Sequence, residues 1–198
     1  MKSSLTALAV TLLASMPATA SPLFSDNFGV SGADIFNWNG APNWTVTTGT
    51  VDLIGAGGSY DLIPGNGRYV DLDGSTNQPG LFATVMTFAP GSYLVQFALG
   101  GSHRSSTETV TVSLGNWSEV FTLNDTDPFT LISRTISTTG GTLRFQNGVD
   151  ASPDVGALLD NVSVSVAVIP EPATLAVFGG IALAGAFGYR RRKATATA

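Results

Sequence analysis

Hydrophobic and polar residues alternate with a period of two through much of the middle of the chain. Tyr93, Val95, Phe97 and Leu99, for example, fall on one face of a single extended segment. A half-buried antiparallel strand requires such alternation, because successive side chains point to opposite faces of a sheet. No segment of this region shows a helical period. The pattern predicts strands at residues 23–28, 44–47, 50–54, 68–72, 81–88, 92–99, 107–114, 117–123, 130–137, 142–146 and 158–166.

Glycine, proline, asparagine and aspartate separate these segments. Pro90-Gly91 is the clearest hairpin turn, because proline fixes φ and glycine accepts a positive φ. Many short strands with turns every ~8–12 residues are typical of a two-sheet sandwich or jelly roll. We therefore predict an all-β fold class, an antiparallel jelly-roll β-sandwich over residues 21–167. The chain has no cysteine, which excludes disulfides and a thiolate metal site.

The first twenty residues differ in character from this region. Lys2 precedes an apolar stretch from Leu5 to Ala14, and Ala18-Thr19-Ala20 offers the small residues of a cleavage site. This order predicts a helical secretory signal peptide at residues 1–20, with the mature chain beginning near Ser21. The alternative is an uncleaved N-terminal anchor.

Residues 168–198 form a second segment of this kind. The sequence Pro170-Glu171-Pro172 is followed by an uncharged apolar run at residues 173–189. As a helix this run would span roughly 25 Å, at the short end of what crosses a bilayer. We predict a transmembrane helix at 173–189, with the preceding domain held outside because the basic cluster after it stays in the cytoplasm. That cluster consists of Arg190, Arg191, Arg192 and Lys193.

The three parts in this order resemble the PEP-CTERM sorting tail of Gram-negative bacteria that make exopolysaccharide. The resemblance implies recognition by a membrane-embedded exosortase, in which Pro170, Glu171 and Pro172 are the sorting motif. It also implies transient residence in the inner membrane, cleavage near the motif, and transfer to the cell surface or extracellular matrix. The alternative is an ordinary C-terminal membrane anchor with a proline stalk.

The net charge of residues 21–167 restricts the classes of partner that this region can bind. Between residues 21 and 167 four arginines and no lysine stand against thirteen acidic residues, a balance of about −9. Nucleic-acid binding needs the opposite sign, so we exclude it. An acidic exported domain suits neutral sugars, divalent cations, or solubility alone.

Two acidic residues share a face of the strand predicted at 68–72. Tyr69, Asp71 and Asp73 alternate with Val70 and Leu72, and Asp52 stands in a shorter version of the same pattern. Two carboxylates on one face could hold Ca²⁺ or a sugar hydroxyl. The alternative is a solvated strand face that ends in an Asp-Gly turn.

Asp160 has the same parity as Val162, which predicts a carboxylate on the core face of the last strand. A carboxylate there needs a partner, because an isolated buried charge is very costly. Asp26 and Asn27 on the first strand would lie beside it in a closed jelly roll, and oxygen ligands of this kind suit Ca²⁺. The alternative is that Asp160 bonds backbone N–H groups or pairs with an arginine.

Aromatic side chains matter for sugar binding because their faces stack on sugar C–H groups. The candidates are Trp38, Trp44 and Trp117, together with Phe36, Tyr60 and Tyr69. Trp38 lies in a polar, glycine-containing segment and is expected to be exposed in a loop. Trp44 and Trp117 begin strands and are expected in the core.

A second resemblance covers most of residues 24–166. Its blocks are Gly49–Ile54, Val70–Gly74, Pro90–Tyr93 with Phe97–Gly101, and Leu159–Val164. Their order resembles the bacterial choice-of-anchor C domain and the galactose-binding-like domains of plant cell walls. It implies a jelly roll associated with carbohydrate or cell wall, without an established activity. The chain departs from this pattern in having no cysteine and a weak opening block, Phe24–Phe28.

The sequence offers no catalytic constellation. His103 is the only histidine, and no G-x-S-x-G segment accompanies it. We therefore predict an exported, non-enzymatic protein that binds carbohydrate in an exopolysaccharide or biofilm matrix, with no cofactor unless Ca²⁺ is bound. The rivals are a secreted enzyme acting on polysaccharide and a structural envelope protein without a ligand.

Overall fold

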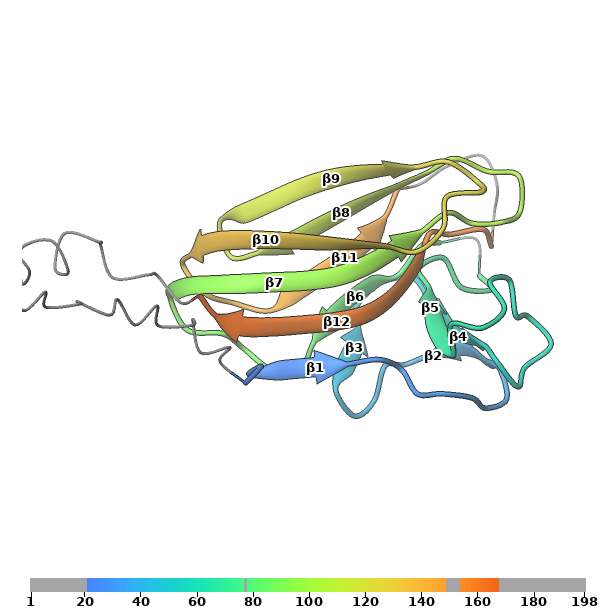
Figure 1. The fold of residues 1–198 in the computed structure, drawn as a ribbon, viewed down its shortest axis with the longest axis horizontal. Helices are drawn as coiled ribbons and strands as arrows, with labels where there is room; N and C mark the ends of the chain where they lie inside the picture. The colour runs from blue at the N-terminus through green and yellow to red at the C-terminus, as the bar shows by residue number, and fades with distance from the viewer. Residues whose placement is uncertain (1–20, 77, 149–153, 168–198) are drawn as a thin grey trace, which may run out of the picture. The chain divides into compact units, whose positions relative to one another are not determined.

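A computed structural model describes residues 21–76, 78–148 and 154–167 of the chain. These residues form twelve β-strands arranged in two sheets that pack face to face (Figure 1). All paired strands within the sheets run antiparallel. The predicted all-β sandwich is therefore confirmed. The predicted signal peptide at 1–20 and transmembrane helix at 173–189 lie outside the described residues.

The larger sheet has seven strands in the order β10-β7-β12-β5-β4-β2, with β1 paired to β12. In that order their bounds are β10 Thr130–Thr138, β7 Gly91–Gly100, β12 Leu158–Val166, β5 Arg68–Asp71, β4 Val51–Gly55, β2 Ile35–Trp38 and β1 Phe24–Asp26.

The smaller sheet has five strands in the order β3-β6-β11-β8-β9. Their bounds are β3 Trp44–Val46, β6 Leu81–Thr84, β11 Leu143–Asn147, β8 Glu108–Leu114 and β9 Trp117–Leu123.

Each predicted segment contains a strand, but β2 was not predicted. Its sequence lies in a polar, glycine-containing segment, which is typical of a loop. In the structure the strand carries two exposed apolar residues, and Asn37 has a positive φ of 51°. It pairs with β4 at Ile35 and Trp38 only, with an irregularity between them. The strand therefore depends on the edge that β4 presents and not on its own alternation.

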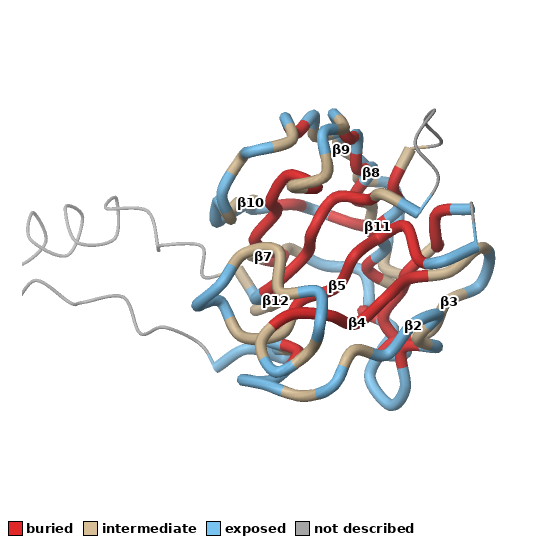
Figure 2. The backbone as a smooth tube through the Cα atoms, turned by 90° about the vertical axis from the view of Figure 1, so that its right-hand side faces the viewer, coloured by how far each residue is buried: buried red, intermediate tan, exposed pale blue. Residues whose placement is uncertain are grey.

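The main core lies between the two sheets and is rich in aromatic rings. Trp44 stacks on Phe82 with ring centroids 4.3 Å apart, and Phe97 meets Phe145 edge to face. Figure 2 shows that the buried segments concentrate in the strands. The predicted inward face of Tyr93 to Leu99 is confirmed. Val166, which shares the parity of Val162 and Val164, is instead 50% exposed, because it is the last residue of β12.

The larger sheet is also covered on its outer side, over β5, β4 and the start of β12. Ile54, Tyr69 and Leu158 form a second, smaller cluster there. Leu62, Ile63 and Phe129, which lie in loops, pack against that cluster. The outer faces of these strands are therefore buried, and of the two interpretations of Tyr69, Asp71 and Asp73 the solvated strand face is wrong.

A bulge in β12 changes the parity of its side chains. The register against β7 shifts between Asp160 and Ser163, and Asn161 has a positive φ of 51°. Leu159 and Val162 consequently both enter the main core, although they differ in parity. Asp160 lies on the side of Leu158, away from the main core, so the prediction that it occupies the core face is wrong.

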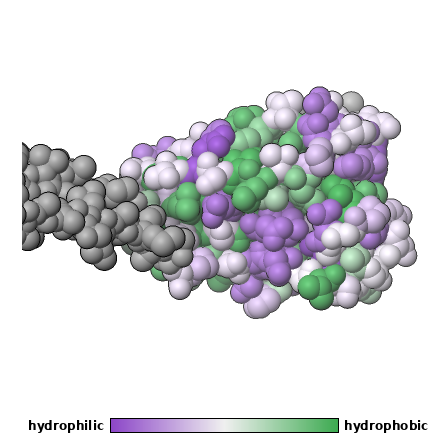
Figure 3. All heavy atoms as spheres, in the orientation of Figure 1, coloured by the Kyte–Doolittle hydropathy of each residue, from purple (hydrophilic) through white to green (hydrophobic). Residues whose placement is uncertain are grey.

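The outer side of β10, β7 and β12 is the open part of the larger sheet. Ser133, Thr135 and Ser137 are exposed on β10, and Leu131 is exposed beside them. Figure 3 shows hydrophobic and hydrophilic residues interspersed on this side of the molecule. The described residues contain no helix with the length and apolarity needed to cross a membrane.

Candidate functional site

A pocket of about 230 Å³ opens on the outer side of β4 and β5. It is lined by Phe36, Asp52, Ile54, Tyr60, Asp71, Ser75, Arg104 and Asp154. Asp52 and Asp71 are direct cross-strand partners, so the pairing of β4 with β5 places both carboxylates on the same side. The chain therefore gathers an aromatic pair, three carboxylates, a hydroxyl and a guanidinium around one hollow.

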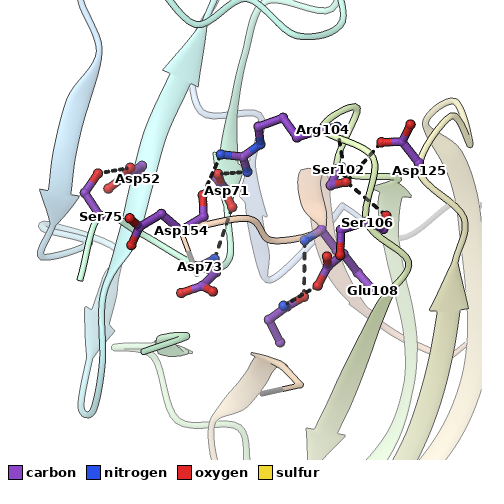
Figure 4. Close-up of polar contacts among 12 residues, drawn as sticks. Asp52, Asp71, Asp73, Ser75, Ser102, Arg104, Ser106, Glu108, Asp125 and Asp154 are labelled. Atoms are coloured by element: carbon purple, nitrogen blue, oxygen red, sulfur yellow. Dashed lines mark hydrogen bonds and ion pairs between the residues drawn. The ribbon is translucent and has the colours of Figure 1, made fainter. Parts of the chain in front are cut away.

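An ion pair closes one side of the pocket. Nη2 of Arg104 donates to Asp71 Oδ2, and Nη1 donates to the carbonyl oxygen of Asp154 at 2.6 Å (Figure 4). The N–H of Asp73 donates to the other oxygen of Asp71 at 3.1 Å. Burial raises the pKa of Asp71 to about 8, although Arg104 and the N–H of Asp73 act in the opposite direction.

The loop that carries Arg104 is held in place by Asp125. Oδ1 of Asp125 accepts the N–H of Ser105 at 2.6 Å and the hydroxyl of Ser102 at 3.2 Å. Ser102 in turn donates to the carbonyl of Ser106 and accepts the N–H of Arg104 (Figure 4). The guanidinium is thus presented to Asp71 by a loop with many internal hydrogen bonds.

Asp52 forms part of the pocket floor and is almost fully buried. Its Oδ1 accepts the N–H of Asn37 at 2.6 Å, and its Oδ2 accepts the hydroxyl of Ser75 at 2.8 Å. No ion pair of Asp52 occurs within the described parts of the chain. These two hydrogen bonds stabilise its carboxylate.

Two aromatic rings stand at the mouth of the pocket. The rings of Phe36 and Tyr60 lie 5.5 Å apart at an interplanar angle of 90°, and each residue is 49% exposed. Asp34 fixes the loop of Tyr60 by accepting the N–H groups of Ser59 at 2.6 Å and of Tyr60 at 3.1 Å. Aromatic faces beside a few converging polar groups are a common arrangement for small polar ligands.

The predicted sugar-binding residues divide between pocket and core. Asp71 lines the pocket, whereas Asp73 is buried and is not part of the pocket lining. Tyr69 has no exposed surface, its hydroxyl accepts the N–H of Ile63 at 2.9 Å, and burial raises its pKa to about 12. Trp38 is half-buried against Phe28 and Phe82, so the prediction of an exposed loop tryptophan is wrong.

The prediction of a core position is confirmed for Trp44 and holds only in part for Trp117. Trp44 is buried, and its indole N–H donates to Asp26 Oδ2 at 2.9 Å. Trp117 is partly buried and packs against the main core.

The residues predicted to hold Ca²⁺ are only partly brought together. Asn27 and Asp160 line a second pocket of about 290 Å³ beside Asn161. Asp26 instead directs its carboxylate to Phe28 N–H, Asn43 and Trp44.

Asp160 itself is held by hydrogen bonds. It accepts the backbone N–H of Asn161 at 2.6 Å and the side-chain amide of Asn161 at 3.0 Å. Burial raises its pKa to about 6. Within the described ranges no three His, Cys, Asp or Glu side chains form a metal-binding group, so the Ca²⁺ site stays a prediction.

Several pocket residues were missed by sequence reasoning. Ser75, Arg104 and Asp154 reach the pocket from loops, and no periodic pattern marks them. Asp52 did carry a signal, since it repeats the pattern around Asp71 on a neighbouring segment. Phe36 and Tyr60 were among the aromatic candidates but ranked behind Trp38, because β2 was read as a loop.

Residues 168–193 match the family model described as the PEP-CTERM protein-sorting motif. The chain therefore carries this motif, as its resemblance predicts. The motif implies export and sorting to the cell surface, with an exosortase as processing partner. No curated protein matches the chain.

Among solved structures the chain is similar to several β-sandwich domains. The CBM22-1 and catalytic modules of xylanase 10B from Clostridium thermocellum, solved with xylohexaose, match at 15% identity and a TM-score of 0.46, over 78% of this chain and 31% of that one. The CBM22-1 xylan-binding domain from Paenibacillus barcinonensis matches at 13% identity and a TM-score of 0.46, over 77% of this chain and 100% of that one. A cleaved adhesin domain of Lys-gingipain from Porphyromonas gingivalis matches at 14% identity and a TM-score of 0.44, over 75% of this chain and 100% of that one.

Proposed function

We propose that the protein is an exported surface or matrix protein whose sandwich domain binds carbohydrate in the pocket between Phe36 and Asp71. The observation that carries this proposal is the pair of half-exposed rings, Phe36 and Tyr60, beside buried hydrogen-bonding groups. The rings offer apolar faces for sugar C–H groups, and Asp52, Ser75 and Asp154 offer partners for hydroxyls. The resemblance to galactose-binding-like domains favours the same class of ligand.

Delivery follows from the sorting motif. Export would begin with the predicted signal peptide at residues 1–20, and the predicted helix at 173–189 would hold the chain briefly in the inner membrane of a Gram-negative bacterium. Exosortase recognition at Pro170, Glu171 and Pro172 would then release it to the surface or to an exopolysaccharide matrix. Carbohydrate binding in that place would help to organise the matrix or biofilm.

We propose binding without catalysis. Hydrolysis of a glycosidic bond uses two carboxyl groups that flank the scissile bond, one as acid and the other as base or nucleophile. In this pocket Asp71 is engaged by Arg104, and both oxygens of Asp52 accept hydrogen bonds from the protein. Because the protein itself engages both carboxyl groups, a binding role is favoured over that of a polysaccharide-acting enzyme.

A binding measurement on the domain at residues 21–167 tests the proposal. We expect a glycan array to identify at least one oligosaccharide, and Phe36→Ala or Tyr60→Ala to weaken its binding about tenfold or more, because each change removes a stacking face. Leu131→Ala, which removes an exposed apolar side chain far from the pocket on β10, serves as the control. Binding that is indifferent to both aromatic changes, or release of sugar from the host matrix, would contradict the proposal.

A further inference from the structure

The charge of the pocket restricts the kind of sugar that fits it. Its ionisable lining consists of the carboxyl groups of Asp52, Asp71 and Asp154 and the guanidinium of Arg104. The net formal charge is one negative unit when Asp71 holds a proton and two when it does not. An anionic sugar would therefore meet a pocket of like charge.

Asp52 carries a buried carboxylate that has no ion-pair partner in the part of the chain that the structure describes. Arg104 directs both terminal nitrogens elsewhere, to Asp71 and to the carbonyl of Asp154. Asp52 is 6% exposed, and among residues 21–76, 78–148 and 154–167 it accepts hydrogen bonds from Asn37 N–H and Ser75. A cation bound in the pocket would gain Coulomb energy from this carboxylate with little screening by water.

The aromatic pair adds a second attraction for a cation. Phe36 and Tyr60 meet at a right angle, so together they form a corner in which at least one ring face is open to a ligand. The face of an aromatic ring attracts an ammonium group through its quadrupole, and desolvation strengthens that attraction. The same rings also accept the C–H face of a sugar.

We infer that the pocket recognises a sugar that carries a free ammonium group, such as a de-N-acetylated amino sugar in a polysaccharide. The ammonium group lies between the carboxylate of Asp52 and the corner formed by Phe36 and Tyr60. Neutral hydroxyl groups of the same sugar residue form hydrogen bonds with Ser75 and Asp154. This inference rests on the proposed carbohydrate-binding function and adds the class of sugar to it.

Calorimetric titration of the domain with three β-1,4-linked tetrasaccharides tests the inference. The probes are a glucosamine tetramer, its fully N-acetylated counterpart and a glucose tetramer, at mildly acidic pH so that the amines are protonated. We expect the glucosamine tetramer to bind roughly tenfold more tightly than either neutral probe. We also expect added salt to reduce this preference.

Two variants, each of which removes one negative charge, distinguish recognition inside the pocket from general attraction to the acidic surface. Asp52→Asn should abolish the preference for the glucosamine tetramer, whereas Glu119→Gln on β9 of the other sheet should preserve it. Should Asp52→Asn fail to fold, Tyr60→Leu at the mouth of the pocket is the second variant, and it should weaken the glucosamine tetramer more than the glucose tetramer, because it removes a ring face that attracts the ammonium group. An equal loss in Asp52→Asn and Glu119→Gln would assign the effect to general attraction of a polycation and overturn the inference.

The outcomes also distinguish this inference from the proposed function. If neutral probes bind as tightly as the glucosamine tetramer, and Phe36→Leu or Tyr60→Leu weakens them, carbohydrate binding stands and the ammonium preference falls. If no carbohydrate binds in the array or in the titrations, the proposed function fails together with the inference.

Discussion

The outer side of the seven-stranded sheet has two regions that share one pattern of residues and differ in their surroundings. Over β10, β7 and β12 most outward positions are serine, threonine or glutamine, with Leu94, Ala98 and Leu131 among them, and those of β10 are exposed to solvent. Over β4 and β5 the outward positions are Asp52, Tyr69 and Asp71, and loops bury them. Alternation therefore tells which side of a strand a residue takes, and the loops decide whether that side meets water.

The largest expected effect comes from comparing the ion pair buried under these loops with a more exposed ion pair between β10 and β9. Arg104→Ala removes the cation beside buried Asp71, and we expect a loss of about 3 kcal/mol in the free energy of unfolding. Arg134→Ala breaks the exposed pair with Glu119, and we expect at most about 1 kcal/mol. Denaturant unfolding of both variants measures the difference.

The pH dependence of Arg104→Ala sharpens this prediction. The raised pKa of Asp71 lets its carboxyl group take up a proton, which removes the uncompensated charge. The loss caused by Arg104→Ala should therefore be smaller at pH 5 than at pH 9. Equal losses for the two arginine variants at pH 9 would show that loop coverage does not isolate Asp71 from water.

The next effect concerns Asp160, which is buried beside the loops at residues 27–30 and 65–67. Its folded-state pKa of about 6 lies above the ordinary value of 3.8, so the folded protein holds a proton that the unfolded chain releases. The stability that this proton contributes is present below pH 4 and is lost as the pH rises through 6. The change should be on the order of 2 kcal/mol.

Thermal melting from pH 4 to pH 7 checks this expectation. Asp160→Asn should make the fall in stability over that window smaller, because the amide does not titrate, and the fall that remains comes from Asp71, whose raised pKa acts in the same direction. Ser163→Ala, two strand positions further along on the open side, should leave the profile unchanged. A wild-type melting temperature that rises across the window would contradict the assignment.

A smaller effect is expected for the hydroxyl of Tyr69. Tyr69→Phe keeps the ring in the outer cluster but leaves the N–H of Ile63 without its acceptor. We expect a loss of about 1–2 kcal/mol by chemical denaturation. Ser133→Ala on the open face should change stability by less than about 0.5 kcal/mol.

The smallest expected effect is that of calcium. If Asn27 and Asp160 bind Ca²⁺ with oxygens from the neighbouring loops, then a concentration ten times the dissociation constant should stabilise the domain by about 1.4 kcal/mol. Melting with and without Ca²⁺ measures this, and Asp160→Asn is the control. An unchanged melting temperature at millimolar Ca²⁺ would rule against the site.

Periodicity predicted most of the sandwich because each long strand buries one face regardless of its neighbours. It failed at β2, where pairing with β4 decides the structure, and at Asp160, where a bulge alters parity. The pocket was harder to predict, because Arg104, Ser75 and Asp154 come from loops whose positions depend on the finished fold. The acidic signal at Asp71 and Asp52 was visible in the sequence, but their burial and their partners were not.

The last strand ends before the sorting motif begins. β12 finishes at Val166, and the N–H of Ala167 still donates to the carbonyl of Ser92 at 2.9 Å. A proteolytic cut anywhere beyond residue 168 would therefore leave in place every strand that the structure describes at residues 21–167, with its hydrogen bonds to other residues of that range. A domain released by such a cut would keep the same sandwich and the same pocket as its precursor.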